Sequence, residues 1–152
     1  MKDRIDLVLE RIRQAALASR RPETSIRLVA VSKTMPVEDV KEAIAAGVTE
    51  FGENYIQEAR EKIASLARYP VTWHFIGHLQ SNKAKYAVRM FDLIHSVDSL
   101  KLAAELDKYA KKTDKVQAIL IQVNLAREDS KSGVYADDIM PLLREIGQLK
   151  NL

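Results

Sequence analysis

Apolar and polar residues alternate in blocks along the chain, and each block has the spacing of one kind of element. The first block predicts an amphipathic helix from Ile5 to about Ala18, because apolar residues recur there at helical spacing with charges between them. The run from Leu28 to Ser32 is short and almost wholly apolar, which is typical of a strand buried on both faces in a parallel sheet. A second amphipathic helix is predicted after Pro36, and Gly47 is suited to cap its end.

The same succession of strand and helix is then predicted four more times along the chain. The predicted strands cover residues 49–52, 71–76, 93–97 and 116–123. The predicted helices cover about 54–67, 80–90, 98–112 and 136–149. Ser81 or Asn82 is placed to cap the helix over 80–90. One helix followed by five strand-helix units predicts a parallel sheet with right-handed crossovers.

The expected fold class is α/β, with a parallel (β/α) architecture of the TIM-barrel type. A repeat of roughly 25 residues, without a Gly-rich fingerprint after the first strand, favours a barrel over a doubly wound sheet. A closed barrel needs eight units and typically about 250 residues. This chain has 152 residues and supplies about five units, so we expect residues 1–152 to form the N-terminal part of a single barrel domain.

The amino-acid composition mainly excludes classes of function. Basic and acidic residues are interspersed and the net charge is only +3, so we expect no nucleic-acid surface. The absence of cysteine excludes disulfides, thiolate catalysis and Cys-ligated zinc or iron-sulfur sites. No signal peptide and no apolar run of membrane-spanning length is present, so a cytoplasmic location without membrane contact is the default expectation.

Polar side chains follow each of the five predicted strands, where parallel α/β folds carry their chemistry. In a parallel barrel these groups converge on one rim, and that convergence is more informative than any single residue. The candidates are Lys33, Glu53-Asn54-Tyr55, His74 with Gly77-His78, His95-Ser96-Asp98, and Asn124.

Lys33 follows the first apolar strand and is the first candidate for covalent chemistry. Burial among apolar neighbours lowers the pKa of a lysine amine, and a neutral amine can attack a carbonyl to form an imine. On this stretch alone a plain surface lysine is the better interpretation, because strand ends are commonly exposed. Lys131, in the loop after the fifth strand, is a second amine that could compete for a carbonyl ligand, although a solvated loop lysine is the simpler interpretation. Asn54 carries a neutral amide that can donate to a phenolate or carbonyl oxygen.

Three histidines suggest an alternative chemistry. His74, His78 and His95, together with Glu53, could ligate zinc and leave one position open for water, as in a metal-dependent hydrolase. Their spacing is not diagnostic, because residues four apart across a strand end do not share a face as they would on a helix. We therefore expect these histidines to form hydrogen bonds within the rim, without a metal.

Several motifs resemble a known family when they are taken in order along the chain. They are Val31-Ser32-Lys33-Thr34, Phe51-Gly52-Glu53-Asn54-Tyr55-Ile56-Gln57-Glu58, Trp73-His74-Phe75-Ile76-Gly77 with Leu79-Gln80-Ser81-Asn82-Lys83, and Ser130-Lys131-Ser132-Gly133. Together they resemble the pyridoxal phosphate homeostasis proteins, whose barrel is similar to the N-terminal domain of alanine racemase. The resemblance implies that Lys33 holds pyridoxal 5'-phosphate (PLP) as a Schiff base. It also implies that Asn54 lies beside the cofactor and that the segment from His74 to Gly77 lines the same rim.

The implied function is PLP homeostasis, in which the protein binds, buffers and delivers the cofactor, with PLP-dependent apo-enzymes as candidate recipients. The alternative is a racemase-like enzyme that uses the same lysine. A racemase needs a further domain to supply its opposite-face acid or base, so from 152 residues we expect a carrier.

One departure from the family concerns the phosphate. The family binds it with a Ser/Gly/Met-rich segment and an Arg-containing strand end in its last third, and neither appears in this sequence. We therefore expect either a longer natural product or impaired cofactor binding. The full-length product is expected to be a monomer, whereas a sheet of five units would leave two open edges that invite pairing with another copy.

Overall fold

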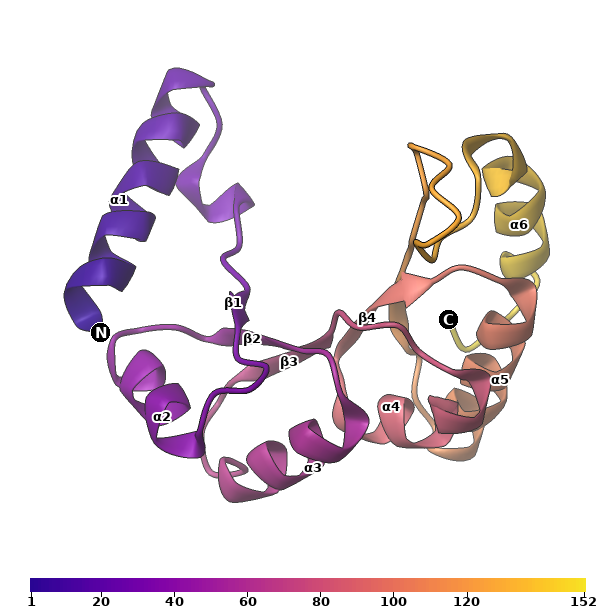
Figure 1. Cartoon of the computed structure of the whole chain (residues 1–152), viewed down its shortest axis with the longest axis horizontal. Helices are drawn as coiled ribbons and strands as arrows, with labels where there is room; N and C mark the ends of the chain where they lie inside the picture. The colour runs from indigo at the N-terminus through magenta and orange to yellow at the C-terminus, as the bar shows by residue number, and fades with distance from the viewer.

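Five parallel strands run in sequence order across the molecule, a computed structural model that describes residues 1–152. They are β1 (Ala30–Val31), β2 (Glu50–Glu53), β3 (Thr72–Phe75), β4 (Leu93–Val97) and β5 (Ala118–Ile121). Each strand pairs in parallel with the next one along the chain. The sheet forms an open arc (Figure 1), as expected for five consecutive units of a (β/α) barrel. The predicted fold class is therefore confirmed.

Every predicted helix is present, although several are shorter than expected. The helices are α1 (Lys2–Ala18), α2 (Val37–Ala45), α3 (Ile56–Ser65), α4 (Ala84–Met90), α5 (Leu100–Lys112) and α6 (Ile139–Ile146). Helices α2 to α5 lie along one side of the curved sheet, and α1 and α6 stand at its two ends (Figure 1). None of these helices combines the length and the apolar character needed to cross a bilayer.

The core lies between the sheet and the helices of its outer side. Successive side chains of a strand point to opposite faces, and Phe51, Trp73 and Phe75 all point to the helix side, where they are buried. The ring of Phe51 lies 5.5 Å from that of Trp73, and Phe75 lies 5.1 Å from Phe91. The prediction that Trp73, Phe75 and Phe91 belong to the core is confirmed.

Two local predictions are wrong. The first strand is only two residues long, and Val31 is 52% exposed, because β1 is an edge strand with one face uncovered. Neither Ser81 nor Asn82 caps a helix, because that segment begins with a 3-10 turn over Ser81–Lys83 and both residues lie inside it. Ser99 does cap its helix, since its hydroxyl accepts a hydrogen bond from the backbone N–H of Leu102.

Candidate functional site

Lys33 lies in a tight turn directly after β1. The N–H of Met35 donates to the carbonyl of Ser32 at 3.1 Å, which places Lys33 and Thr34 at the centre of the turn. Thr34 has a φ of 63°, in the left-handed region that a β-branched residue rarely adopts. The side chain of Lys33 is exposed and not buried among apolar neighbours. The turn nevertheless presents this amine at the carboxyl end of a parallel strand, where such folds place their chemistry.

A buried ionic network holds this turn from the helix side. Lys62, on α3, donates to Glu53 Oε1 at 2.8 Å and to Glu58 Oε1 at 2.5 Å. The ammonium of Lys62 also donates to the carbonyl of Ser32. The hydroxyl of Ser32 donates to the same Glu53 oxygen at 2.7 Å, and the N–H of Thr34 donates to Glu58 Oε1 at 2.5 Å. The hydrogen bond from Lys62 lowers the pKa of Glu58, which keeps this carboxylate charged.

Sequence reasoning missed Lys62 and misplaced Glu53. Glu53 does not face the rim: it points to the helix side and is fully buried. A signal for Lys62 was available in the sequence. It lies three residues after Ala59 on α3 and four before Leu66, which directly follows this helix, and both of these residues are fully buried. A lysine in such a stripe requires an acidic partner, and Glu58 stands one turn earlier on the same helix.

The ends of β2 and β3 approach each other at Asn54 and Gly77. A Cβ atom on Gly77 would lie 2.2 Å from the carbonyl oxygen of Asn54, so only glycine fits this position. The Oδ1 atom of Asn54 is buried without a hydrogen-bond partner, which is unusual because buried polar groups are normally paired. Asn54 also borders a cavity of about 300 Å³, together with Tyr55 and His78. An unpaired amide beside a cavity is available to a ligand, as acceptor or, with the amide turned over, as donor.

The three histidines do not share one site. His74 is buried within β3, on the face opposite the helices, and its Nδ1 lies 2.9 Å from Nε2 of His95 on β4. Its other ring nitrogen lies 3.0 Å from Glu50 Oε2, although the angle is not that of a hydrogen bond. His78 follows β3, and its Nδ1 lies 3.0 Å from the hydroxyl of Ser132. The expectation that His74 and His95 reach the rim is wrong, because both lie within their strands.

The zinc alternative therefore lacks its ligand set. No group of three histidine, aspartate or glutamate side chains has the geometry to hold a metal ion. Burial lowers the pKa of His74, against the opposing charge of Glu50. Burial also lowers the pKa of His95, and the neighbouring His74 adds to this effect. The pair is thus neutral at pH 7 and links β3 to β4 through a hydrogen bond.

The remaining strand ends meet around His78, as the expected convergence requires. A cavity of about 440 Å³ lies between His78 and Asp98, and one of about 360 Å³ lies between His78, Asn124 and Lys131. The amide of Asn124 donates to two carbonyls of its own loop, which fixes the loop after β5. Lys131 is exposed and pairs with Glu128 at 2.7 Å. This matches the interpretation of Lys131 as a solvated loop residue.

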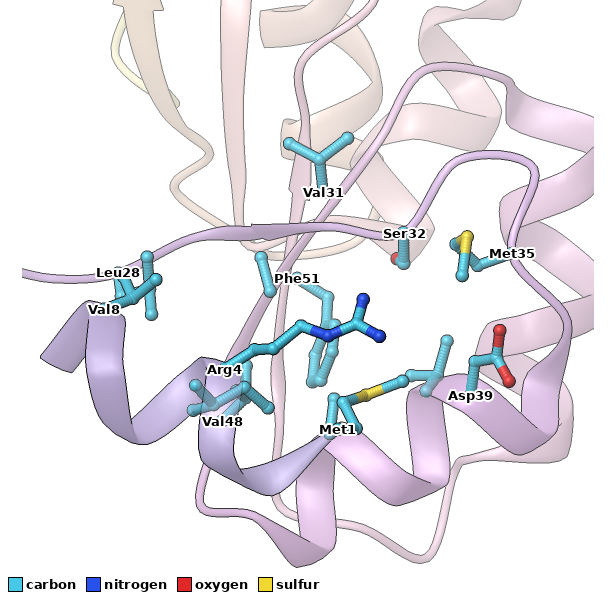
Figure 2. A pocket seen from close by; sticks show the side chains of 14 residues that line it. Met1, Arg4, Val8, Leu28, Val31, Ser32, Met35, Asp39, Val48 and Phe51 are labelled. Carbon is cyan, nitrogen blue, oxygen red and sulfur yellow. The ribbon is translucent and has the colours of Figure 1, made fainter.

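A separate cavity of about 290 Å³ lies on the other side of β1, between α1 and α2 (Figure 2). Its lining is mostly apolar and includes Val8, Val48 and Phe51. Arg4 and Asp39 are its charged members. No residue that lines this cavity also lines the cavities around His78, so the apolar cavity and the polar rim are distinct features.

The alanine racemase N-terminal domain family has a sequence model that matches residues 6–152. The chain belongs to this family. The structure of PipY from Synechococcus elongatus, with PLP bound, is 44% identical, has a TM-score of 0.79 and covers 91% of this chain and 64% of that one. Alanine racemase from Clostridium difficile 630 has a TM-score of 0.68 at 14% identity, which shows the shared fold alone.

Two curated relatives indicate which members of this family the chain is similar to. The pyridoxal phosphate homeostasis proteins of Pasteurella multocida and Pseudomonas aeruginosa are 43% and 45% identical to this chain. The matches cover 95% and 99% of the chain but only 63% and 65% of the relatives, so the chain spans slightly less than two thirds of their length. The family resemblance inferred from the motifs is confirmed.

Proposed function

We propose that this chain is the PLP-binding part of a PLP homeostasis protein, which buffers and delivers the cofactor without catalysing a reaction. The observation that carries this proposal is the turn after β1, which leaves Lys33 exposed at the carboxyl end of a strand paired with β2, whose own end is followed by the unpaired amide of Asn54. The names of the relatives and the PLP bound to PipY support the same ligand. PLP-dependent apo-enzymes are the proposed recipients.

The residues at the rim fit the aldehyde and ring of PLP. When bound, PLP supplies an aldehyde that condenses reversibly with a primary amine. Lys33 provides that amine, as a Schiff base. The amide of Asn54, which has no partner within the chain, is free to hydrogen-bond a ring substituent, and Gly77 contributes by letting the end of β3 pack directly against the backbone of Asn54. We assign the phosphate group no residue of this chain.

In this proposal His74 supports the site indirectly, through its position inside β3. Its side chain is buried in β3, three residues before Gly77, so it cannot present a hydrogen bond at the rim surface. Its hydrogen bond to His95 ties β3 to β4 and steadies the strand end that carries Gly77. Its role is therefore to support the cofactor site, without direct contact to the aldehyde.

Replacement of Lys33 tests the proposed function directly. Lys33→Ala removes the only amine that we place at the site, so the visible absorbance of the PLP complex disappears. The variant keeps the unfolding free energy within about 0.5 kcal/mol, because an exposed turn residue contributes little packing. Lys131→Ala is the matched control, an exposed loop lysine whose removal leaves the absorbance unchanged.

Two results would contradict the proposal. Absorbance that survives in Lys33→Ala but disappears in Lys131→Ala would move the Schiff base to the loop after β5. Exchange of the α-proton of labelled amino acids with solvent, at the turnover rate of an enzyme and dependent on Lys33, would replace the carrier with a racemase-like enzyme.

A further inference from the structure

Lys62 is the one fully buried lysine of the site region, and the binding of PLP as proposed does not use it. All three of its N–H donors have acceptors, namely Glu53, Glu58 and the carbonyl of Ser32. Stability alone is a poor reason for such an arrangement, because well-packed apolar residues often replace a buried ion pair at no loss of stability. The geometry of the contacts suggests a more specific task.

The network contacts the backbone on both sides of Lys33. Lys62 binds the carbonyl of the residue before it, Ser32, and Glu58 binds the N–H of the residue after it, Thr34. Thr34 holds a φ of 63°, at a turn position where glycine or asparagine is usual. A conformation of this kind persists only where the surrounding structure enforces it. Lys62 and Glu58 supply that enforcement.

The neighbouring helices α1 and α2 give the turn little support. Ser32 and Met35 border the apolar cavity between α1 and α2 (Figure 2), which has a volume of about 290 Å³. Met35 is 40% exposed, so it does not clamp the turn by packing. The ionic network on the α3 side is therefore the main side-chain restraint on the backbone at Lys33.

We propose that Lys62, with Glu58, is a positioning residue that fixes the turn carrying Lys33 and so holds its amine toward the rim. This inference rests on the proposed function, because it gives Lys62 a role in presenting the amine to an aldehyde. It has a consequence that needs no PLP: the amide of Thr34 is protected from hydrogen exchange by Glu58, and this protection depends on Lys62.

The experiment compares three variants of the whole chain. Lys62→Met keeps the apolar stem and removes the charge, and Glu58→Ala removes the acceptor of Thr34 while leaving Lys62 paired with Glu53. Lys115→Met is the matched control. Lys115 is half-buried, and its ammonium, like that of Lys62, binds backbone carbonyls, here those of Val88 and Phe91, far along the chain from the turn. Glu58→Ala keeps the test valid if Lys62→Met does not fold.

Two quantities are measured on each variant: the exchange rate of the Thr34 amide, and the rate at which PLP with cyanoborohydride labels Lys33, with Lys131 as internal standard. We expect Lys62→Met and Glu58→Ala to raise the exchange rate of the Thr34 amide and to lower the labelling rate of Lys33, each by about tenfold. Labelling slows because a reactive group that is displaced from its productive position reacts more slowly. Lys115→Met changes neither rate. Lys62→Arg retains a charged donor, so both its exchange rate and its labelling rate lie between those of Lys62→Met and those of the unaltered chain.

The outcomes separate this inference from the proposed function. If Lys33 of the unaltered chain is not labelled, the proposed function fails, and the Thr34 exchange rates still decide whether Lys62 fixes the turn. If Lys33 is labelled but neither rate differs between Lys62→Met, Glu58→Ala and the unaltered chain, the positioning role is overturned and PLP binding stands. If Lys62→Met and Lys115→Met change the two rates equally, Lys62 stabilises the fold in general and does not position the turn, which would overturn the inference.

Discussion

Lys62 and His74 are both buried polar residues, and they avoid an unpaired charge in opposite ways. Two carboxylates and a carbonyl surround the ammonium of Lys62. His74 gives up its charge, since burial lowers its pKa and a second neutral imidazole is its partner. Only the second solution makes the stability of the fold sensitive to pH near neutrality.

The histidine pair predicts destabilisation by mild acid. Because the pKa values of His74 and His95 are lowered in the folded chain, the unfolded chain binds more protons once the pH falls below about 6.5. The free energy of unfolding is therefore level above that pH and decreases below it. Urea titrations between about pH 7.5 and about pH 5 measure the slope.

The control for this prediction is the exposed histidine. His95→Gln, which keeps a hydrogen-bonding side chain next to His74, flattens the pH dependence, whereas His78→Gln leaves it unchanged. An equal slope in His95→Gln and the unaltered chain would show that other groups cause the acid sensitivity.

The position of a candidate residue could be predicted only where it does not depend on which face of the strand the side chain occupies. Lys33, Asn54 and Gly77 follow their strands, and the apolar pattern alone locates a strand end. Glu53 is the last residue of β2 and His74 is the last but one of β3, and a shift of one residue along a strand moves a side chain to the other face. Their partners, on α3 and β4, come from packing that periodicity does not encode.

Elements were predicted more reliably than side chains. The order of five strands and six helices follows from blocks of apolar residues, and each of these elements is present. Their ends could not be predicted equally well, because β1 loses part of its length at a sheet edge and a 3-10 turn replaces the start of the helix after β3. Both effects depend on neighbours in space.

The close approach of β2 and β3 predicts a severe effect of Gly77→Ala. The added methyl group would lie 2.2 Å from the carbonyl oxygen of Asn54, so the two strand ends must separate. We expect the free energy of unfolding to fall by about 3 kcal/mol, with loss of PLP binding. Gly47→Ala is the control: its φ of 97° disfavours alanine but no atom lies within 4 Å, so the cost is about 1 kcal/mol. Chemical denaturation of both variants measures the difference, and equal losses would contradict a steric cause.

The apolar cavity between α1 and α2 predicts a stabilising substitution. Ala43 lines this space of about 290 Å³, so Ala43→Leu fills part of it and raises the free energy of unfolding by about 1 kcal/mol. Ala110→Leu, in the fully buried core on α5, lowers it by about 2 kcal/mol because no space is provided for the added carbons. Thermal unfolding of the two variants checks the opposite signs. A loss of stability in Ala43→Leu would mean that the helices close over the cavity in solution.

At the scale of the whole molecule, the arc of five strands has two edges, β1 and β5. β1 is very short, while β5 has four residues and exposes Leu120 at 48%. Unpaired edges of this kind pair readily with other strands. The openness of the sheet was predictable from the number of units, because eight are needed for closure.

The edge at β5 predicts self-association of this chain. Sedimentation velocity over a range of concentrations should show a growing fraction of dimers or larger species. Leu120→Lys places a charge on the exposed face of β5 and suppresses this association. Lys85→Leu, on the exposed outer surface of α4, is a control that leaves the edge intact. A chain that stays monomeric throughout, with or without Leu120→Lys, would contradict the prediction.

The central claim, that Lys33 carries the cofactor, is tested most directly by locating the covalent bond. The chain is incubated with PLP and reduced with borohydride, and its peptides are mapped by mass spectrometry. The account predicts a pyridoxyl group on the peptide that contains Lys33, at higher occupancy than on any other lysine. A label on Lys131 in its place, or labelling of Lys33 no greater than that of the other exposed lysines, would contradict it.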